Sequence, residues 1–432
     1  MNKDVSDSDL RSLRTHDQQP NRIASITQKF EETFGSLPTF VASAPGRVNL
    51  IGEHTDYNDG YVFPVAIDKY INIAARQRTD RHVTLHAPDV NDSWKFDLDA
   101  LPSIPQQAPA WSHYLIGVAS LLQASGRKVT GIDAVITGDV PIGAGLSSSA
   151  ALSVSATLAF LTAPSELEAP MEALVSESDK KELAALCQRV EHEFAGVNCG
   201  IMDQMISLLG RENHGLFLDC RSLEYEHIPL NLAGHYITIC NTKVKRELAT
   251  SEYNKRRAEC ERGVEILRKW ISGISSLRDI ALTDFKKHEE ELPMLTQKRC
   301  RYVIEENTRV LDAVSVLKAH NQQITKKTDE ALIQFGRLMN ASHNGLRDDY
   351  EVSCKELDLL TDIARSITGV IGSRMTGAGF GGCTVSIVHK DALETFQTRV
   401  KKEYHEQIGI EPEIYLCRVG DGAQVFWSTE LS

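Results

Sequence analysis

A short stretch of small and hydroxyl-bearing residues, leading directly into an apolar helix, constrains this chain most strongly. Residues 139–151 read Asp-Val-Pro-Ile-Gly-Ala-Gly-Leu-Ser-Ser-Ser-Ala-Ala, and an apolar segment follows at once. The first N–H groups of a helix lack partners within it, and the helix dipole is positive at that end. Gly143 and Gly145 let the backbone approach a ligand closely. The pattern therefore indicates either an ordinary serine N-cap or a site for an anion such as phosphate.

The charge balance narrows the choice of partner. The chain has 432 residues, enough for two or three domains, and a formal net charge of −12. Because nucleic acids are bound largely through Lys and Arg, this charge argues against a nucleic-acid partner, although a nucleotide needs only a local pocket of donors. No apolar run approaches the length of a membrane span, so we expect no membrane partner.

Cysteine usage and the N-terminus both favour a cytoplasmic protein. The nine cysteines are odd in number, widely spread, and include no Cys-x-x-Cys pair. This pattern favours reduced thiols over a disulfide framework or a zinc site. The polar and acidic first residues, Met-Asn-Lys-Asp-Val-Ser-Asp, do not form a signal peptide.

Hydrophobic periodicity and turn residues predict an α+β protein without internal repeats. Helices are expected over 23–34, 111–124, 183–194, 249–270 and much of 275–366, and strands over 61–75, 82–87, 132–137, 215–220, 236–241 and 383–388. We expect residues 1–21 to be a disordered tail and the acidic, proline-containing residues 163–182 to be an exposed loop. The expected division is an N-terminal lobe over 22–210 and a C-terminal lobe over 211–432.

A second cluster, between Ala44 and Gly60, gathers groups that suit a polyol. The sequence Gly-Glu-His-Thr-Asp places Glu53, His54 and Asp56 within four positions. A carboxylate accepts two hydrogen bonds side by side, as the vicinal hydroxyls of a sugar require. Such clusters are more often solvated charged turns. A zinc site is disfavoured because no His-Glu-x-x-His motif is present.

A third glycine-rich segment lies at residues 377–382, Gly-Ala-Gly-Phe-Gly-Gly. It matches the dinucleotide fingerprint in letters, but that fingerprint should open a helix, whereas a β-branched strand follows here. We therefore reject an NAD site. None of these loops ends in Gly-Lys-Ser/Thr, which excludes a P-loop.

Together these motifs resemble the galactokinase family. The segment 46–60 is similar to its sugar motif, and Pro141–Ala150 resembles the ATP loop of the superfamily that also contains homoserine, mevalonate and phosphomevalonate kinases. Arg374–Gly382 is similar to the superfamily's C-terminal glycine motif, and the blocks 199–204 and 251–257 also resemble galactokinases. The resemblance covers residues 22–428. It implies a two-lobed small-molecule kinase fold, with the active site between the lobes, and ATP-dependent phosphorylation of galactose at the C1 hydroxyl.

The resemblance also implies a role for each matching residue. Asp203 and Arg47 would be catalytic. The sugar contacts would be Glu53, His54, Thr55, Asp56, Gly200 and Tyr253; the ATP loop would be Gly143, Ala144, Gly145, Leu146, Ser147, Ser148 and Ser149; and Mg²⁺ would be held by Ser149 and Glu191. One hydroxyl and one carboxylate suit Mg²⁺, which takes its remaining ligands from phosphate and water.

Two other functions stay open from the residues alone. Some galactokinase-like proteins only sense sugar and ATP, and such sensors tend to be altered in the Ser-Ser-Ser-Ala loop. Here residues 147–150 and Asp203 are intact, which favours an enzyme. The substrate is alternatively N-acetylgalactosamine or another galactose-like hexose, because the size of the pocket at C2 is not visible in the sequence.

Overall fold

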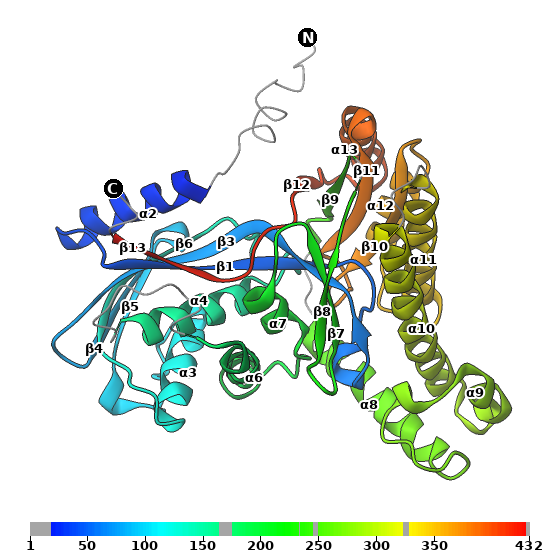
Figure 1. Cartoon of the computed structure of the whole chain (residues 1–432), viewed down its shortest axis with the longest axis horizontal. Helices are drawn as coiled ribbons and strands as arrows, with labels where there is room; N and C mark the ends of the chain where they lie inside the picture. Colours follow the sequence, from blue (N-terminus) through cyan, green and yellow to red (C-terminus); the bar gives the residue numbers. More distant parts are fainter. Residues whose placement is uncertain (1–18, 164–174, 233, 245–248, 323–327, 429–432) are drawn as a thin grey trace.

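The structure, a computed structural model, describes residues 19–163, 175–232, 234–244, 249–322 and 328–428, and Figure 1 shows its arrangement. The predicted α+β class is confirmed, because the described residues form helices and three separate sheets whose strands pair mainly antiparallel. Residues 1–18 of the predicted tail and 164–174 of the predicted acidic loop lie outside the described residues. Residues 19–21 open the first described helix, so the predicted tail was too long by three residues.

The first sheet has six strands in the order β13-β1-β3-β6-β4-β5. Its strands are β1 (Phe40–Asn49), β3 (Pro64–Gln77), β4 (His82–Ala87), β5 (Asp92–Asp97), β6 (Ile132–Gly138) and β13 (Gln424–Trp427). All neighbours are antiparallel except β4 and β6. The last described strand therefore returns to pair with the first, and β13 forms one edge of this sheet.

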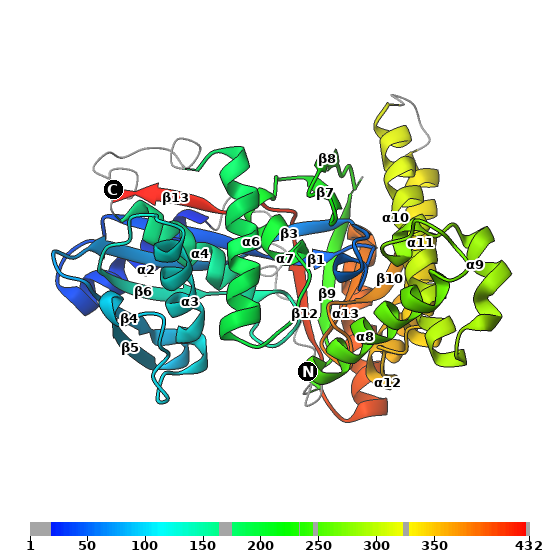
Figure 2. The ribbon, with the colours of Figure 1, turned by 90° about the horizontal axis from the view of Figure 1, so that it is seen from below.

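Helices cover both faces of this sheet. One face carries α2 (Gln19–Phe34), and the other carries α3 (Ala110–Ala124), α4 (Ser148–Thr162), α6 (Glu177–Phe194) and α7 (Met202–Leu209), which Figures 1 and 2 show below the sheet and in front of it. On α2 the buried residues Ile23, Ile26 and Phe30 recur at helical spacing and pack on the sheet, as predicted. Helix α4 is buried along most of its length, which its small and apolar sequence permits.

The C-terminal part contains a four-stranded sheet in the order β10-β11-β9-β12. Its strands are β9 (His235–Asn241), β10 (Val370–Thr376), β11 (Cys383–His389) and β12 (Glu413–Cys417). A separate three-stranded sheet consists of β2 (Tyr61–Val62), β7 (His214–Asp219) and β8 (Tyr225–Pro229). The helices are α8 (Ala249–Leu267), α9 (Leu282–His288), α10 (Met294–Gln322), α11 (Thr328–Asp348), α12 (Lys355–Arg365) and α13 (Leu393–Ile408). Apolar residues of α12 and α13 form a cluster with the four-stranded sheet.

Three further predicted boundaries were wrong. The predicted loop 163–182 extended too far, because α6 already begins at Glu177, where Ser176 and Asp179 form a capping box. The predicted strand 61–75 is divided at Phe63 into β2 and β3. The predicted helix 249–270 ends at Leu267.

The prediction of reduced thiols is met by the structure. All nine cysteines are free thiols. Within the described part of the chain, no helix combines the length and the apolar character that crossing a membrane requires.

The contact between β1 and the β10–β11 hairpin brings distant motifs together. The Asn49 N–H at the end of β1 donates to the Thr376 hydroxyl at 3.2 Å, and Arg374 Nη1 donates to the Asn49 carbonyl at 2.8 Å. The glycine-rich segment 377–382 is the turn of this hairpin, and β11 follows it, as the sequence predicted. The cluster of Glu53, His54 and Asp56 after β1, called the sugar-like cluster below because it suits a polyol, therefore lies next to the glycine-rich segment 377–382.

Candidate active site

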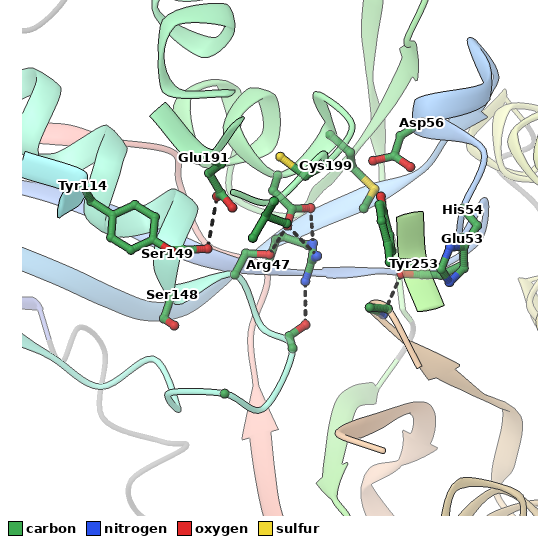
Figure 3. A pocket seen from close by; sticks show the side chains of 18 residues that line it. Arg47, Glu53, His54, Asp56, Tyr114, Ser148, Ser149, Glu191, Cys199 and Tyr253 are labelled. Carbon is green, nitrogen blue, oxygen red and sulfur yellow. Dashed lines mark hydrogen bonds and ion pairs between the residues drawn. The ribbon is translucent and has the colours of Figure 1, made fainter. Parts of the chain in front are cut away.

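One pocket collects most of the residues that the sequence singled out (Figure 3). It lies where the end of β1, the start of α4, the start of α7 and the β10–β11 turn meet. Its lining consists of Arg47, Glu53, His54, Asp56, Tyr114, Gly143, Gly145, Ser147, Ser148, Ser149, Glu191, Val197, Cys199, Met202, Asp203, Tyr253, Gly377 and Ala378.

Four of the predicted residues support this pocket without lining it. Ala144 and Leu146 are buried beneath the loop that carries the serines. The buried Thr55 hydroxyl bonds to the carbonyls of Gly52 and Tyr61, which closes the turn of the sugar-like cluster. A Cβ placed on Gly200 would lie 2.0 Å from the Asp56 carboxylate, so this residue sets how closely the backbone approaches that group.

Arg47 and Asp203 form a two-point ion pair in the middle of the pocket. Arg47 Nε donates to Asp203 Oδ1 and Nη2 donates to Oδ2, both at 2.7 Å, and Nη1 donates to the Gly145 carbonyl at 2.7 Å. The Ser147 hydroxyl also donates to Asp203 Oδ2. Burial lowers the pKa of Arg47, but the carboxylates of Asp203 and Glu53 outweigh burial and raise it. Arg47 therefore stays charged and joins residues 143–149, called the serine loop below, to Asp203.

Local backbone features place this pair. A β-bulge between Pro45 and Arg47 shifts the register of β1 against β3, and the Arg47 N–H donates to the Leu146 carbonyl at 3.1 Å. Asp203 is in the first turn of α7, where the helix dipole favours a carboxylate. Ser147 has a left-handed backbone (φ 59°) that ends the loop at the start of α4.

Ser149 and Glu191 meet on the α4 side of the pocket, at the left of Figure 3. The Ser149 hydroxyl donates to Glu191 Oε1 at 3.1 Å, and the Gln204 amide reaches the same oxygen at 3.3 Å. Burial, and then the charge of Asp203, raise the pKa of Glu191 to about 7.

The donors on this side fit a magnesium ion that also takes phosphate and water ligands. The Ser149 hydroxyl and the Glu191 carboxylate are oxygen ligands of the kind that Mg²⁺ prefers. A cation beside the buried Glu191 would also offset the cost of burying the charge of that carboxylate. Among the described residues, no group of three or more His, Cys, Asp or Glu side chains is arranged so that it could hold a metal ion by itself.

Glu53 is held from two directions by the β10–β11 hairpin. Arg374 Nη1 donates to Glu53 Oε2 at 2.8 Å, and the Gly377 N–H donates to Oε1 at 2.6 Å. Arg374 is fully buried and Glu53 is 2% exposed. Burial raises the pKa of Glu53, and the charges of Arg374 and Arg47 act against it. A carboxylate fixed in this way presents its remaining lone pairs in one orientation.

Aromatic rings surround the rest of the sugar-like cluster. The His54 ring lies 5.4 Å from the Tyr253 ring and 5.7 Å from the Tyr57 ring. Burial, and then the charge of Arg256, lower the pKa of His54 to about 3, so the ring is neutral. Burial, followed by the charges of Asp203 and Glu53, raises the pKa of Asp56 to about 7. The pocket therefore combines acceptors with apolar ring faces, as sugar sites need.

Several lining residues were not identified from the sequence. Tyr114, on α3, and Val197 had no motif around them, so no sequence feature marked them. Cys199 and Met202 lie inside the recognised block 199–204, and Ala378 lies inside the glycine-rich segment, so these three could have been inferred from their neighbours. Arg374 reaches the pocket only through Glu53, a contact between residues 321 positions apart.

Comparisons with known proteins agree with this geometry. Residues 28–77 match the model of the galactokinase galactose-binding signature, residues 113–211 the GHMP kinases N terminal domain, and residues 327–406 the GHMP kinases C terminal model. A galactokinase of Roseiflexus sp. is 44% identical over 397 residues, covering 92% of this chain and 95% of that protein. One from Chloroflexus aggregans is 42% identical over 408 residues, covering 94% and 99%.

Solved structures give the same result. The Lactococcus lactis galactokinase complexed with galactose superposes with a TM-score of 0.83 at 35% identity, covering 93% of this chain and 99% of that one. A mevalonate kinase at 19% identity shares the fold, with a TM-score of 0.55 and coverage of 88% and 99%. Since the galactose-binding signature matches and relatives at 35% to 44% identity cover 92% to 94% of the chain, the chain belongs to the galactokinase family of kinases.

Proposed function

We propose that this pocket transfers the γ-phosphoryl group of ATP to the C1 hydroxyl of D-galactose, giving galactose 1-phosphate and ADP. The observation that carries the proposal is the position of the Arg47–Asp203 pair, which contacts the serine loop on one side and faces the sugar-like cluster on the other. The intact ion pair and serine loop argue against a sugar sensor without activity.

The sugar is bound by the cluster after β1 and its neighbours. Glu53, His54, Asp56 and Tyr253 contact the hydroxyls and the ring directly, whereas Thr55 shapes the turn and Gly200 allows close backbone approach. The Lactococcus lactis relative was solved with galactose, and its likeness to this chain supports galactose as the substrate. Epimers that leave a buried carboxylate unpaired are rejected.

ATP binds along residues 143–149, at the N-terminus of α4, where free N–H groups and hydroxyls meet the phosphates. Ser149 and Glu191 would hold Mg²⁺, which would neutralise phosphate charge when bound. We further propose two lobes, residues 22–210 and 211–432, of which the second returns β13 to the sheet of the first. The active site lies between the lobes, and the proposed location is cytoplasmic.

Two residues of the pocket, Asp203 and Arg47, account for the proposed chemistry. Asp203 accepts the proton of the C1 hydroxyl, and the free lone pair on its Oδ1 leaves room for that contact. Arg47 holds the carboxylate at two points and places positive charge beside the oxygen that attacks phosphorus. Because phosphoryl transfer has a loose transition state, fixed orientation and charge supply most of the rate.

The Asp203→Asn variant tests the base directly. Its kcat should fall by about 10³-fold, since general-base catalysis contributes factors of this order. Galactose affinity, measured by calorimetry, should change little because asparagine keeps the size of the aspartate side chain. Near-normal turnover in this variant would remove Asp203 from the role.

A panel of free sugars tests the substrate. ATP turnover by the wild type is measured with galactose, glucose and N-acetylgalactosamine, with Asp203→Asn as the inactive control. Galactose should give the highest kcat/KM. Equal rates with glucose would contradict the sugar assignment, and a preference for N-acetylgalactosamine would move the assignment to another galactose-like sugar.

A further inference from the structure

A chain of hydrogen-bonding side chains leads away from the pocket behind His54. His54 Nδ1 lies 2.7 Å from the Tyr57 hydroxyl, which lies 2.8 Å from the Tyr350 hydroxyl, and the latter lies 3.3 Å from the Cys260 sulfur. Tyr350 and Cys260 are fully buried, and His54 is 4% exposed. These groups come from the turn after β1, from the residues just after α11 and from α8, so three distant segments meet behind one ring.

The role of this chain of hydrogen bonds, called the relay below, depends on which atom carries the proton in each contact. Burial raises the pKa values of Tyr57 and Tyr350 well above the usual range, so both phenols keep their protons. Burial likewise raises the pKa of Cys260 to about 12, which leaves a thiol rather than a thiolate. The neutral His54 ring has one N–H donor and one acceptor nitrogen. Only two arrangements satisfy every contact, and they run in opposite directions.

The energies of the end contacts favour one direction. In the first arrangement the thiol donates to Tyr350, Tyr350 donates to Tyr57, and Tyr57 donates to His54 Nδ1. In the reverse arrangement a phenol O–H ends on a thiol sulfur, which is a weak acceptor. The first arrangement ends on the better acceptor, an imidazole nitrogen.

The opposite side of the ring supports the same direction. His54 Nε2 makes no hydrogen bond to any described residue, although it is buried in the lining of the pocket. The main chain of Ala378 acts to raise the pKa of His54, which only an acceptor, its carbonyl oxygen, can do. A carbonyl beside the ring favours a ring nitrogen that carries a proton, and Nε2 is the nitrogen that has no other partner among the described residues.

We propose that Tyr57 and Tyr350 are positioning residues that fix His54 as the tautomer with its proton on Nε2, so that the ring donates a hydrogen bond to a sugar hydroxyl. This inference rests on the proposed function for the identity of the ligand. A hydroxyl has one proton, and Asp56 in the same pocket offers an acceptor for it. With the other tautomer, that hydroxyl would face two acceptors and leave one of them unpaired, at a cost in affinity.

The proton position is measured by ¹⁵N NMR of the histidine side chains in the full chain. The chain has 14 histidines, so His54 is assigned by the signal lost in His54→Gln. We expect a protonated Nε2 and an unprotonated Nδ1 in the wild type, and a mixture of tautomers in Tyr57→Phe and Tyr350→Phe. A wild-type proton on Nδ1, or an unchanged tautomer in both variants, would overturn the proposal.

Galactose binding supplies the second measurement. Both variants should lose about threefold to tenfold in galactose affinity by calorimetry, the usual value of one hydrogen bond, with little change in KM for ATP. Tyr404→Phe is the matched control, since this fully buried tyrosine donates to the Thr242 carbonyl at 2.9 Å, outside the pocket. An equal loss in the control would show a general packing effect and overturn the proposal.

The two readouts separate this inference from the function on which it rests. A wild-type chain that binds no galactose would contradict the proposed function. The tautomer of His54 in the free chain would still decide whether the relay sets the proton position.

Discussion

Residues 143–149 and residues 53–56 line the same pocket, but they are held in place differently. Ile142 and Gly143 are exposed, and the serine loop is tied to the rest of the pocket mainly by Arg47 and Asp203. Glu53, His54 and Thr55 are at most 4% exposed. Residues from β10 and α10 hold them, including Glu306, whose carboxylate accepts from the Gly52 N–H at 2.8 Å.

The difference follows from what each side must recognise. A phosphate chain has many equivalent oxygens, and backbone N–H groups at a helix N-terminus bind it without a rigid frame. Sugar epimers differ only in the direction of a hydroxyl, so the acceptors that distinguish them have to be fixed by packing and by buried hydrogen bonds. We therefore expect substitutions on the sugar side to act mainly on galactose, and those on the phosphate side to act on ATP and metal.

Gly379→Val should have the largest effect. A Cβ at Gly379 would lie 2.1 Å from the Val352 carbonyl oxygen, and the backbone φ of +83° disfavours any side chain, so the hairpin that holds Glu53 must move. Because a displacement of about 1 Å can cost about 100-fold, we expect kcat/KM for galactose to fall by that order. Gly273→Val is the control, since it has φ +79° but no atom within 4 Å. A fully active Gly379→Val would show that the hairpin does not shape the sugar side.

Glu191→Gln and Ser149→Ala test the phosphate side. Each removes one of the two proposed metal ligands, and the Mg²⁺ concentration for half-maximal rate should rise by about 30-fold in each. The KM for galactose should change much less. Glu193→Gln, two residues along on α6, is the control, because its carboxylate pairs with Arg189 at the surface. An unchanged metal requirement in both variants would show that the metal site is elsewhere.

Gly200→Ala should affect the sugar specifically. The new Cβ would overlap the Asp56 carboxylate, which must rotate away. The KM for galactose should then rise by about tenfold, the cost of misplacing one charged hydrogen bond, while the KM for ATP stays near its wild-type value. Equal changes in the KM for galactose and the KM for ATP would mean that the sugar side and the phosphate side of the pocket are coupled.

The pH dependence of galactose binding should show the smallest effect. Burial, and then neighbouring carboxylates, raise the pKa of Asp56 to about 7, so the ionised acceptor is lost as the pH falls through that value. If only the ionised form binds galactose, the affinity should drop about fourfold from pH 8 to pH 6.5. For stability the sign is opposite, because a carboxyl whose folded pKa is raised stabilises the fold increasingly as pH falls from 7 toward 4. Asp56→Asn should flatten the binding profile, and an unchanged profile would assign the titration to another group.

The same division explains what the sequence could predict. The serine loop was recognisable because its pattern is local: glycines, hydroxyls and an apolar helix follow one another within residues 139–162. The cluster Glu53–Asp56 was also visible as a motif. The contacts that support it were not visible, although Arg374 lies in a recognised motif, because Arg374, Glu306 and Tyr350 are separated from the cluster by about 250 residues or more along the chain. Only the packing of β1 against β10 and α10 brings them together.

The predicted ends of helices and loops were wrong where local sequence preferences and tertiary packing compete. The acidic residues 177–182 were predicted to belong to a loop, but Ser176 and Asp179 cap a helix that buries Leu183 and Leu186 in the core. The return of β13 to pair with β1 was likewise not predicted, since its four residues carry no pattern that names a partner.

Identification of the reaction product tests the central claim most directly. The wild-type chain is incubated with ATP, Mg²⁺ and galactose labelled with ¹³C at C1, and the product is observed by ³¹P and ¹³C NMR. We expect one sugar phosphate whose phosphorus couples to the labelled carbon, formed with one ADP per sugar, and none in Asp203→Asn. Phosphate on another carbon, or no sugar phosphate at all, would contradict the account.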